Sequence, residues 1–314
     1  MVEAPARRTP RPTAAAAVVF DGVTKRYGTF TAVDRISFAV PSGAIFGILG
    51  SNGAGKTTSI RMLMNILRPD EGTIQVLGQE AGEAIKPRIG YLPEERGLYK
   101  KMRLGELLRF FGRIKGRDDA FLDGQIDSWL ERMGLAGWID RRVEELSKGM
   151  SQKLQFVVTV IHAPDLLVLD EPFAGLDPVN RDVLRDAVLE MQGEGTTVVF
   201  STHVMEQAEQ LCDRLVMIHD GRVVRGGTLE EVKASEGRQA VHVRLGLHPG
   251  RDLAGLPGVA AVDDRGHEAE LLLEDDADPQ VLLRALVERA DLSRFEVREP
   301  SLHEIFKRMA RVGS

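Results

Sequence analysis

An eight-residue segment combines glycines, a lysine and a threonine in a spacing that suits phosphate binding. It reads Gly50-Ser51-Asn52-Gly53-Ala54-Gly55-Lys56-Thr57, followed by Thr58, and fits the pattern G-x-x-x-x-G-K-[ST]. Backbone N–H groups of such a loop can surround phosphate oxygens, and a following helix adds the positive end of its dipole. We expect Lys56 to reach the β- and γ-phosphates and Thr57 to offer its hydroxyl to Mg²⁺, which prefers oxygen ligands. The segment therefore predicts binding of a nucleoside triphosphate.

Two carboxylates follow a second short apolar run. Residues 166–169 are Leu-Leu-Val-Leu, and Asp170 and Glu171 come directly after them. The carboxyl end of a parallel strand faces the ligand crevice of an open α/β sheet. Asp170 would hold Mg²⁺, directly or through water, and Glu171 would act as general base on the attacking water. The alternative is a pair of acids stabilised by the dipole of the following helix, with no chemical role.

The segments around these residues alternate between buried strands and amphipathic helices. Residues 45–49 predict a strand before the glycine-rich loop, and a helix follows it and stops before Pro69. Residues 166–169 and 197–200 are continuous apolar runs typical of buried parallel strands, and a helix beginning near Pro178 separates them. The helix after the loop has apolar residues at Ile60, Leu63, Met64 and Leu67. We therefore predict an α/β core with a parallel sheet.

Other parts of the chain have different patterns. Alternation at Ile36, Phe38 and Val40 indicates a strand, and Asp220-Gly221 predicts a tight hairpin turn. Residues 100–145 are charged and have helical periodicity, so we expect a helical insertion, with the helical subdomain at about 98–150. Strict alternation at Val241, Val243, Leu245 and Leu247 then begins a small α+β domain, for which a ferredoxin-like arrangement is one option. The predicted organisation is a disordered tail over 1–17, a main domain over 18–238 and an accessory domain over 239–314.

Composition excludes several classes of protein. The net charge of −6 argues against a nucleic-acid-coating surface, although a local basic patch can exist on an acidic protein. The one cysteine, Cys212, excludes an internal disulfide and is expected to fill space on an apolar helix face. No stretch approaches the roughly 18 apolar residues that cross a bilayer, and the first residues lack the apolar centre of a secretory signal. We expect a cytoplasmic protein that reaches the membrane through a partner.

One further segment makes the interpretation specific. Leu146-Ser147-Lys148-Gly149-Met150 resembles the Leu-Ser-Gly-Gly-Gln signature of the ATP-binding-cassette (ABC) family, and it precedes the acidic strand as in that family. Tyr27 resembles the aromatic residue that stacks on adenine, Asp177 the aspartate of the D-loop, and His203 the switch histidine. The resemblance extends from residue 18 to about residue 238. It implies a P-loop ATPase core with an antiparallel β subdomain and a helical subdomain.

The resemblance also implies a mechanism. One loop covers only one side of the γ-phosphate, whereas phosphoryl transfer needs its charge neutralised on all sides. In the family two cassettes dimerise head to tail, so Ser147 and the backbone at Gly149 of one chain would cap the γ-phosphate held by Lys56 of the other. His203 would bond to the γ-phosphate and orient the water. Hydrolysis would then open the dimer.

Two residues depart from the family pattern. Glu94 follows residues 89–93 where the family usually has glutamine, and its carboxylate could still bind Mg²⁺ or water. Met150 ends the signature where the family has glutamine, which removes a polar contact across the dimer. The run Glu94-Glu95-Arg96-Gly97-Leu98-Tyr99 and the segment at residues 302–306 resemble a bacterial exporter subgroup with a small C-terminal domain.

The leading hypothesis is therefore an ATPase subunit that uses ATP and Mg²⁺, forms a dimer with a second ATP-binding subunit, and docks on an integral membrane permease at the inner face of the membrane. The permease would fit the cleft beside Glu94 and residues 98–145, and hydrolysis would drive export. A soluble ABC ATPase acting on ribosomes or DNA is the alternative, and a nucleotide-binding module without turnover is a third. The sequence does not identify the transported substrate.

Overall fold

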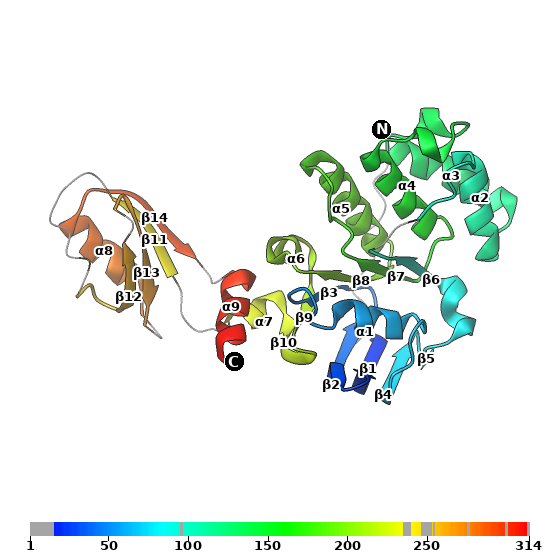
Figure 1. Ribbon diagram of the computed structural model, residues 1–314. Helices are drawn as coiled ribbons and strands as arrows, with labels where there is room; N and C mark the ends of the chain where they lie inside the picture. The colour runs from blue at the N-terminus through cyan, green and yellow to red at the C-terminus, as the bar shows by residue number, and fades with distance from the viewer. Residues whose placement is uncertain are drawn as a thin grey trace. The chain divides into compact units, whose positions relative to one another are not determined.

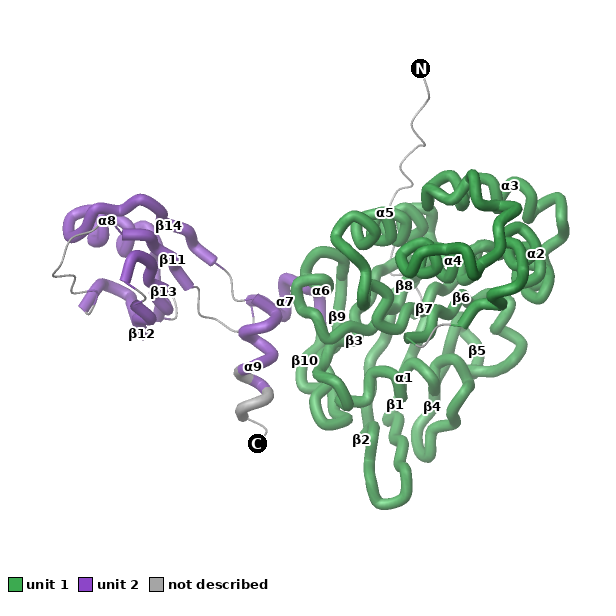
Figure 2. The backbone as a smooth tube through the Cα atoms, turned by 45° about the horizontal axis from the view of Figure 1, so that its top comes forward, with its two compact units in different colours: residues 1–226 green, residues 227–314 purple. Residues whose placement is uncertain are grey.

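The computed structural model describes residues 16–94, 97–234, 240–245, 253, 255–264, 266–274, 277–298 and 301–312. The chain forms two compact units, one ending at Gly226 and one beginning at Gly227, which Figure 2 colours separately. The division comes before residue 238, where the sequence suggested a change, and the domain boundaries proposed from sequence stay predictions. Residues 1–15 of the expected tail lie outside the described ranges, but Ala16 and Ala17 already belong to the first strand and Ala17 is buried.

The first unit contains two sheets (Figure 1). The antiparallel sheet has the order β2-β1-β4-β5, and the six-stranded sheet has the order β10-β9-β3-β8-β7-β6. The strands of the antiparallel sheet are β1 (Ala16–Tyr27), β2 (Phe30–Pro41), β4 (Glu71–Val76) and β5 (Gln79–Glu80). Those of the larger sheet are β3 (Ile45–Leu49), β6 (Ile89–Leu92), β7 (Leu166–Asp170), β8 (Thr197–Thr202), β9 (Arg214–His219) and β10 (Arg222–Thr228). The pairs β6–β7, β7–β8, β8–β3 and β3–β9 are parallel, which confirms the predicted α/β core.

Helices surround the parallel sheet, and two of them, α2 and α3, lie within the predicted insertion at residues 100–145. Figure 1 shows α2, α3 and α4 grouped together on one side of the unit. The helices are α1 (Lys56–Leu63), α2 (Leu104–Ile114), α3 (Asp119–Arg132), α4 (Lys148–Val160), α5 (Pro178–Gly193) and α6 (Met205–Leu211). Short 3₁₀ turns lie at η1 (Glu83–Arg88), η2 (Ala136–Trp138) and η3 (Val143–Glu145). The apolar faces of α2 and α3 are buried as their periodicity predicts.

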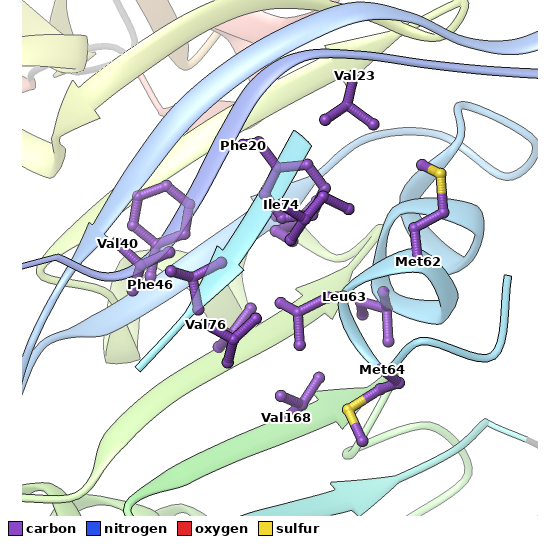
Figure 3. Close-up of a cluster of buried hydrophobic side chains, with 14 of the residues drawn as sticks. Phe20, Val23, Val40, Phe46, Met62, Leu63, Met64, Ile74, Val76 and Val168 are labelled. Atoms are coloured by element: carbon purple, nitrogen blue, oxygen red, sulfur yellow. The ribbon is translucent and has the colours of Figure 1, made fainter. Parts of the chain in front are cut away.

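One hydrophobic core joins the two sheets through α1 (Figure 3). Phe20 of β1 stacks on Phe38 of β2 at 4.5 Å between ring centroids, and Phe38 stacks on Phe46 of β3 at 5.6 Å. Leu63 of α1 and Val168 of β7 belong to the same cluster. This packing joins α1, β3 and β7 in one core.

Helix α1 is shorter than its periodicity predicts. It ends at Leu63, and Asn65 adopts a left-handed backbone conformation with φ +52°. Such a residue reverses the chain, so Leu67 reaches the same core from a turn and not from the helix. The predicted hairpin between β9 and β10 is confirmed, because Asp220 and Gly221 both have positive φ (47° and 75°) as a type I′ turn requires.

Cys212 is buried at the end of α6, in agreement with its predicted space-filling position. A Cβ on Gly47 of β3 would lie 2.6 Å from the Cys212 sulfur, so only glycine allows the sulfur to pack there. Burial raises the pKa of the Cys212 thiol, and the charge on Asp213 adds to this effect.

The second unit is a four-stranded antiparallel sheet with helices. The strands β11 (Ala240–Leu245), β12 (Val259–Asp264), β13 (Glu268–Leu273) and β14 (Leu292–Arg298) have the order β12-β13-β11-β14. Helix α8 (Pro279–Arg289) places Leu282 and Leu286 in the core of this sheet, and the unit also includes α7 (Leu229–Ala234) and α9 (Leu302–Val312). This is the strand order of a ferredoxin-like sheet. Part of the link between β11 and β12, with Leu247, lies outside the described residues, and its described part is not helical.

We predict that Phe20→Ala destabilises the first unit strongly. The ring is buried between the sheets, and truncating a buried phenylalanine costs about 3–5 kcal/mol of unfolding free energy. Urea unfolding followed by circular dichroism measures the loss. Ile66→Ala is the control, because Ile66 is 55% exposed and its truncation should change stability little. Equal effects of the two substitutions would contradict the proposed core.

Candidate functional site

The glycine-rich loop lies between the end of β3 and the start of α1, where it packs tightly against neighbouring backbone. Gly55 has φ +107°, and a Cβ there would lie 2.6 Å from the carbonyl oxygen of Ala32. A Cβ on Gly50 would lie 2.4 Å from the carbonyl oxygen of Ile218. Any side chain at either position would displace the loop. The two glycines therefore fix a loop with exposed N–H groups at the helix N-terminus, the arrangement that binds phosphate.

The Lys56 side chain is buried and points back into the loop. Its Nζ donates to the carbonyl oxygens of Gly50 (2.9 Å) and Ser51 (3.1 Å) and lies 3.7 Å from Glu171 Oε1. Burial lowers the pKa of Lys56, while the charges of Glu171 and Asp170 act in the opposite direction. A buried ammonium needs anionic or carbonyl partners, and phosphate oxygens in the same loop would meet that need.

Asp170 lies at the end of β7 beside Thr57. Its Oδ1 accepts hydrogen bonds from Ser201 Oγ and from Thr57 Oγ1, the latter at 3.4 Å. Its Oδ2 is buried and has no hydrogen-bond partner among the described residues. Burial raises the pKa of Asp170, and the hydrogen bonds from Ser201 and Thr57 oppose that shift.

An unpartnered buried carboxylate oxygen next to a threonine hydroxyl fits Mg²⁺. In the described part of the chain no three His, Cys, Asp or Glu side chains gather to hold a metal by themselves. A magnesium ion here would therefore need phosphate oxygens and water to complete its shell.

Glu171 and His203 form a pair at the ends of β7 and β8. His203 Nδ1 lies 2.8 Å from Glu171 Oε1, and Thr202 Oγ1 lies 3.3 Å from Oε2. Because an ionised carboxylate only accepts, the Nδ1 N–H is the donor in this pair, and Nε2 is left to bond to a ligand. Glu171 has φ +48°, a conformation that costs energy in a non-glycine residue and concentrates at functional sites.

Lys56, Thr57, Glu171 and His203 line one cavity of about 470 Å³, whereas Asp170 is not among its described lining residues and reaches it only through its bond to Thr57. Its lining residues are Tyr27, Phe30, Ala32, Asn52, Gly53, Gly55, Lys56, Thr57, Thr58, Glu94, Glu171 and His203. A second hollow of about 500 Å³ lies between the end of α1 and β4, and Arg68 and Glu80 are its only charged lining residues. Among the described residues it has no lysine and no histidine, whereas the first cavity has Lys56, Glu171 and His203, so we assign the expected chemistry to the first cavity.

The signature residues lie elsewhere in the fold. Within the described chain, none of Ser147, Lys148, Gly149, Met150 and Asp177 lines the cavity around Lys56. Ser147 caps α4 by accepting from the Met150 N–H at 3.3 Å, and Asp177 caps α5 by accepting from the Asn180 N–H at 3.0 Å. A Cβ on Gly149 would lie 2.9 Å from Asn180 Nδ2, so the two helix starts are neighbours. The roles proposed from sequence for all these residues stay predictions.

Sequence reasoning missed four residues of the site. Phe30 and Ala32 line the cavity, and Ser201 and Thr202 bond to Asp170 and Glu171. Phe30 could have been found, because only Gly28-Thr29 separates it from Tyr27, a spacing that suits a two-residue hairpin. Ser201 and Thr202 follow the predicted strand at 197–200. Because neighbouring parallel strands end at the same edge of a sheet, these two residues could have been expected beside Asp170 and Glu171. Of the run at residues 94–99, Glu95 and Arg96 lie outside the described residues.

Every helix in the described ranges is too short or too polar to cross a lipid bilayer.

Two family models match the chain. The ABC transporter model covers residues 33–174, and a model described as the C-terminal domain of DrrA1-3-like ATP-binding proteins covers residues 227–310. The chain is 39% identical over 292 residues to the uncharacterized ABC transporter ATP-binding protein YhaQ of Bacillus subtilis, spanning 92% of this chain and 97% of that protein. It is 36% identical over 299 residues to Nod factor export ATP-binding protein I of Paraburkholderia xenovorans, spanning 94% and 97%. A solved ATP-binding subunit of an ABC transporter shares 29% identity with a TM-score of 0.67, over 70% of this chain and 93% of that one.

We predict that Asp170→Asn stabilises the ligand-free protein at neutral pH. The folded-state pKa of Asp170 is raised, so the wild type loses stability as the pH rises through that pKa, because its carboxylate is then charged and buried. The asparagine has no such charge. Thermal unfolding should show a higher midpoint for the variant near pH 7 and a smaller difference toward pH 4. A lower midpoint at pH 7 would contradict the burial argument.

Proposed function

Because the chain belongs to the ATP-binding proteins of ABC transporters, we propose that it binds and hydrolyses ATP to energise transport through a separate membrane permease. The observation that carries the proposal is the single cavity in which Lys56, the acidic end of β7 and His203 meet. In this proposal the same cavity both binds ATP and hydrolyses it.

In this proposal the triphosphate lies in the loop of residues 50–55, with Lys56 on the β- and γ-phosphates and the base beside Tyr27. Lys56 exchanges its bonds with the Gly50 and Ser51 carbonyls for bonds to phosphate oxygens. Thr57 and Asp170 would hold Mg²⁺, with Glu94 as a further oxygen ligand. The ion would neutralise charge on the phosphates.

Glu171 and His203 carry the chemical step. The Glu171 carboxylate accepts a proton from the attacking water, whose oxygen forms a bond to the γ-phosphorus. The bond between the γ-phosphorus and the bridging oxygen breaks. ADP leaves with this oxygen and with the electron pair of the broken bond. His203 donates through its Nδ1 N–H to Glu171, and with a second proton on Nε2 it would donate to a γ-phosphate oxygen. The distance of 2.8 Å between His203 Nδ1 and Glu171 Oε1 supports a hydrogen bond that orients the imidazole.

A second copy of the chain completes the site. The signature residues Ser147, Lys148, Gly149 and Met150 do not line their own cavity, which supports a role on the partner's γ-phosphate. The N-terminus of α4, capped by Ser147, would then face phosphate, and Asp177 would lie at the dimer interface. Because Met150 has no carboxamide, one polar contact across the dimer is lost. The stability of the dimer should therefore depend more on the remaining contacts.

The permease would dock on an exposed aromatic group of the helical insertion. Tyr99 lies 5.8 Å from Phe110 and 6.1 Å from Phe111 between ring centroids, and Ile114 continues this surface one turn later on α2. Tyr99, Phe110 and Ile114 are exposed, which suits an apolar helix of a membrane protein. We assign export as the direction because one relative is named as an export protein. The protein would therefore lie at the inner face of the membrane through its permease.

We predict that Glu171→Gln traps an ATP-bound dimer. The amide cannot accept the proton from water, so the nucleotide holds the two copies together. Size-exclusion chromatography with ATP and Mg²⁺ should show a dimer for the variant and a monomer without nucleotide. Lys56→Ala is the matched control and should abolish both ATP hydrolysis and dimer formation. A variant that stays monomeric with bound ATP would argue against the shared site, and turnover by Lys56→Ala would show that the loop is misassigned.

We also predict that Phe110→Asp weakens binding to the permease. When the tagged full chain is purified from its host, a polytopic membrane protein should co-purify with the wild type and not with the variant. A charge in the aromatic group should oppose an apolar partner, while ATP binding at the distant cavity persists. Leu189→Asp on α5 is the control, since Leu189 is a similarly exposed residue outside this surface. Recovery of ribosomes or DNA with no membrane protein would overturn the transporter proposal.

A further inference from the structure

A buried hydroxyl beside the proposed general base has two acceptors for its single proton. Thr202 is the last residue of β8 and is fully buried. Its Oγ1 lies 3.3 Å from Glu171 Oε2 and 3.0 Å from Oε1 of Gln207, a residue of α6. The same Oγ1 accepts a hydrogen bond of 3.1 Å from the Val204 N–H. Because a hydroxyl donates once and accepts at two lone pairs, its proton serves one of the two acceptors at a time.

The two oxygens of the Glu171 carboxylate have different neighbours. Oε1 accepts from His203 Nδ1 at 2.8 Å and lies 3.7 Å from the ammonium of Lys56, whereas Oε2 faces the Thr202 hydroxyl. A carboxylate oxygen close to a cation and an N–H donor is a weaker proton acceptor than one close to a neutral group. In the proposed reaction the proton of the attacking water therefore goes to Oε2, while the oxygen of that water bonds to the γ-phosphorus.

The direction of the Thr202 proton decides whether this hydroxyl favours the ionised or the protonated form of Glu171. A hydroxyl that donates to Oε2 stabilises the ionised carboxylate and opposes its protonation. A hydroxyl that donates to Gln207 turns a lone pair toward Oε2, and this lone pair can accept a hydrogen bond from the carboxyl group once Oε2 is protonated. The contact of Thr202 with Gln207 is the shorter of the two.

Resting on the function proposed above, we infer that Gln207 is a positioning residue for ATP hydrolysis, because it keeps the Thr202 proton away from Glu171. The Gln207 carboxamide oxygen ends a chain in which protonated Glu171 donates to Thr202 and Thr202 donates to Gln207. The chain is complete only when Glu171 takes the proton of water, so it stabilises the transition state more than the resting site. Gln207 is not among the residues that line the nucleotide cavity in the described chain, and it acts through Thr202.

Steady-state ATP hydrolysis by the full chain with Mg²⁺ tests the inference. Gln207→Leu has no oxygen to accept the proton, so Thr202 donates to Glu171 and kcat should fall about tenfold, the effect of roughly one hydrogen bond. KM for ATP and the affinity for ADP, measured by calorimetric titration, should stay unchanged. Gln207→Glu supplies another oxygen acceptor and should retain kcat. Gln210→Leu is the matched control, because Gln210 is an exposed residue of the same helix.

Two further measurements separate this role from a structural one. In a chain that already has Thr202→Val, Gln207→Leu should lower kcat no further, because the hydroxyl through which Gln207 acts is gone. In a chain that already has Glu171→Gln, Gln207→Leu should leave ATP-driven dimer formation intact on size-exclusion chromatography. That result would show that α6 and the nucleotide cavity keep their structure in the variant.

Each alternative result has a distinct meaning. An unchanged kcat for Gln207→Leu would overturn the inference, and so would a fall in kcat that Gln207→Glu shares. A loss of ADP affinity or of the trapped dimer would mean that the substitution disturbs the fold of the site, which also contradicts a role through the proton. A further fall of kcat on top of Thr202→Val would show that Gln207 acts by another route. Failure of the proposed function looks different, because then the wild type does not hydrolyse ATP or Glu171→Gln hydrolyses it equally well.

Discussion

The buried ammonium of Lys56 is the constraint on which the site depends. Burying a charge is costly unless partners surround it, and here the partners are two loop carbonyls and the Glu171 carboxylate. The carbonyls come from the end of β3 and the carboxylate from the end of β7, so the parallel sheet must place both strand ends within reach of one side chain. The stacked rings of Phe20, Phe38 and Phe46 and helix α1 support that geometry through the core that the two sheets share.

The acidic residues around this lysine are arranged in two groups with different partners. Asp170 bonds to hydroxyls on two elements and keeps one oxygen without a partner, which suits a cation. Glu171 bonds to His203 and Thr202, which suits proton transfer. Adjacent side chains on a strand point to opposite faces, but the left-handed conformation of Glu171 ends this alternation. The unusual backbone at one residue thus turns the Glu171 carboxylate into the cavity, while Asp170 contacts the cavity residue Thr57.

Patterns local in the sequence predicted much of this arrangement. The spacing of Gly50, Gly55 and Lys56 indicated the loop, and the apolar runs before it and before Asp170 indicated the two strands. Phe30 was missed because the alternation of apolar residues does not fix strand register, whereas the two-residue turn at Gly28-Thr29, which does set its pairing with Tyr27, was not used. The early end of α1 was missed because Asn65 adopts a positive φ that the apolar periodicity does not reveal. The bond between His203 and Glu171 joins residues that are distant in the chain, so it follows from sheet order and not from spacing.

The packing of Cys212 against Gly47 has a practical consequence for measuring motion. Thiol reagents attack the thiolate, and the thiol of Cys212, the one cysteine of the chain, is both buried and held in its protonated form. Cysteines introduced at exposed positions would therefore accept spin labels or fluorophores selectively, without first removing the native residue. Distances between such labels could test in real time whether the proposed dimer opens and closes.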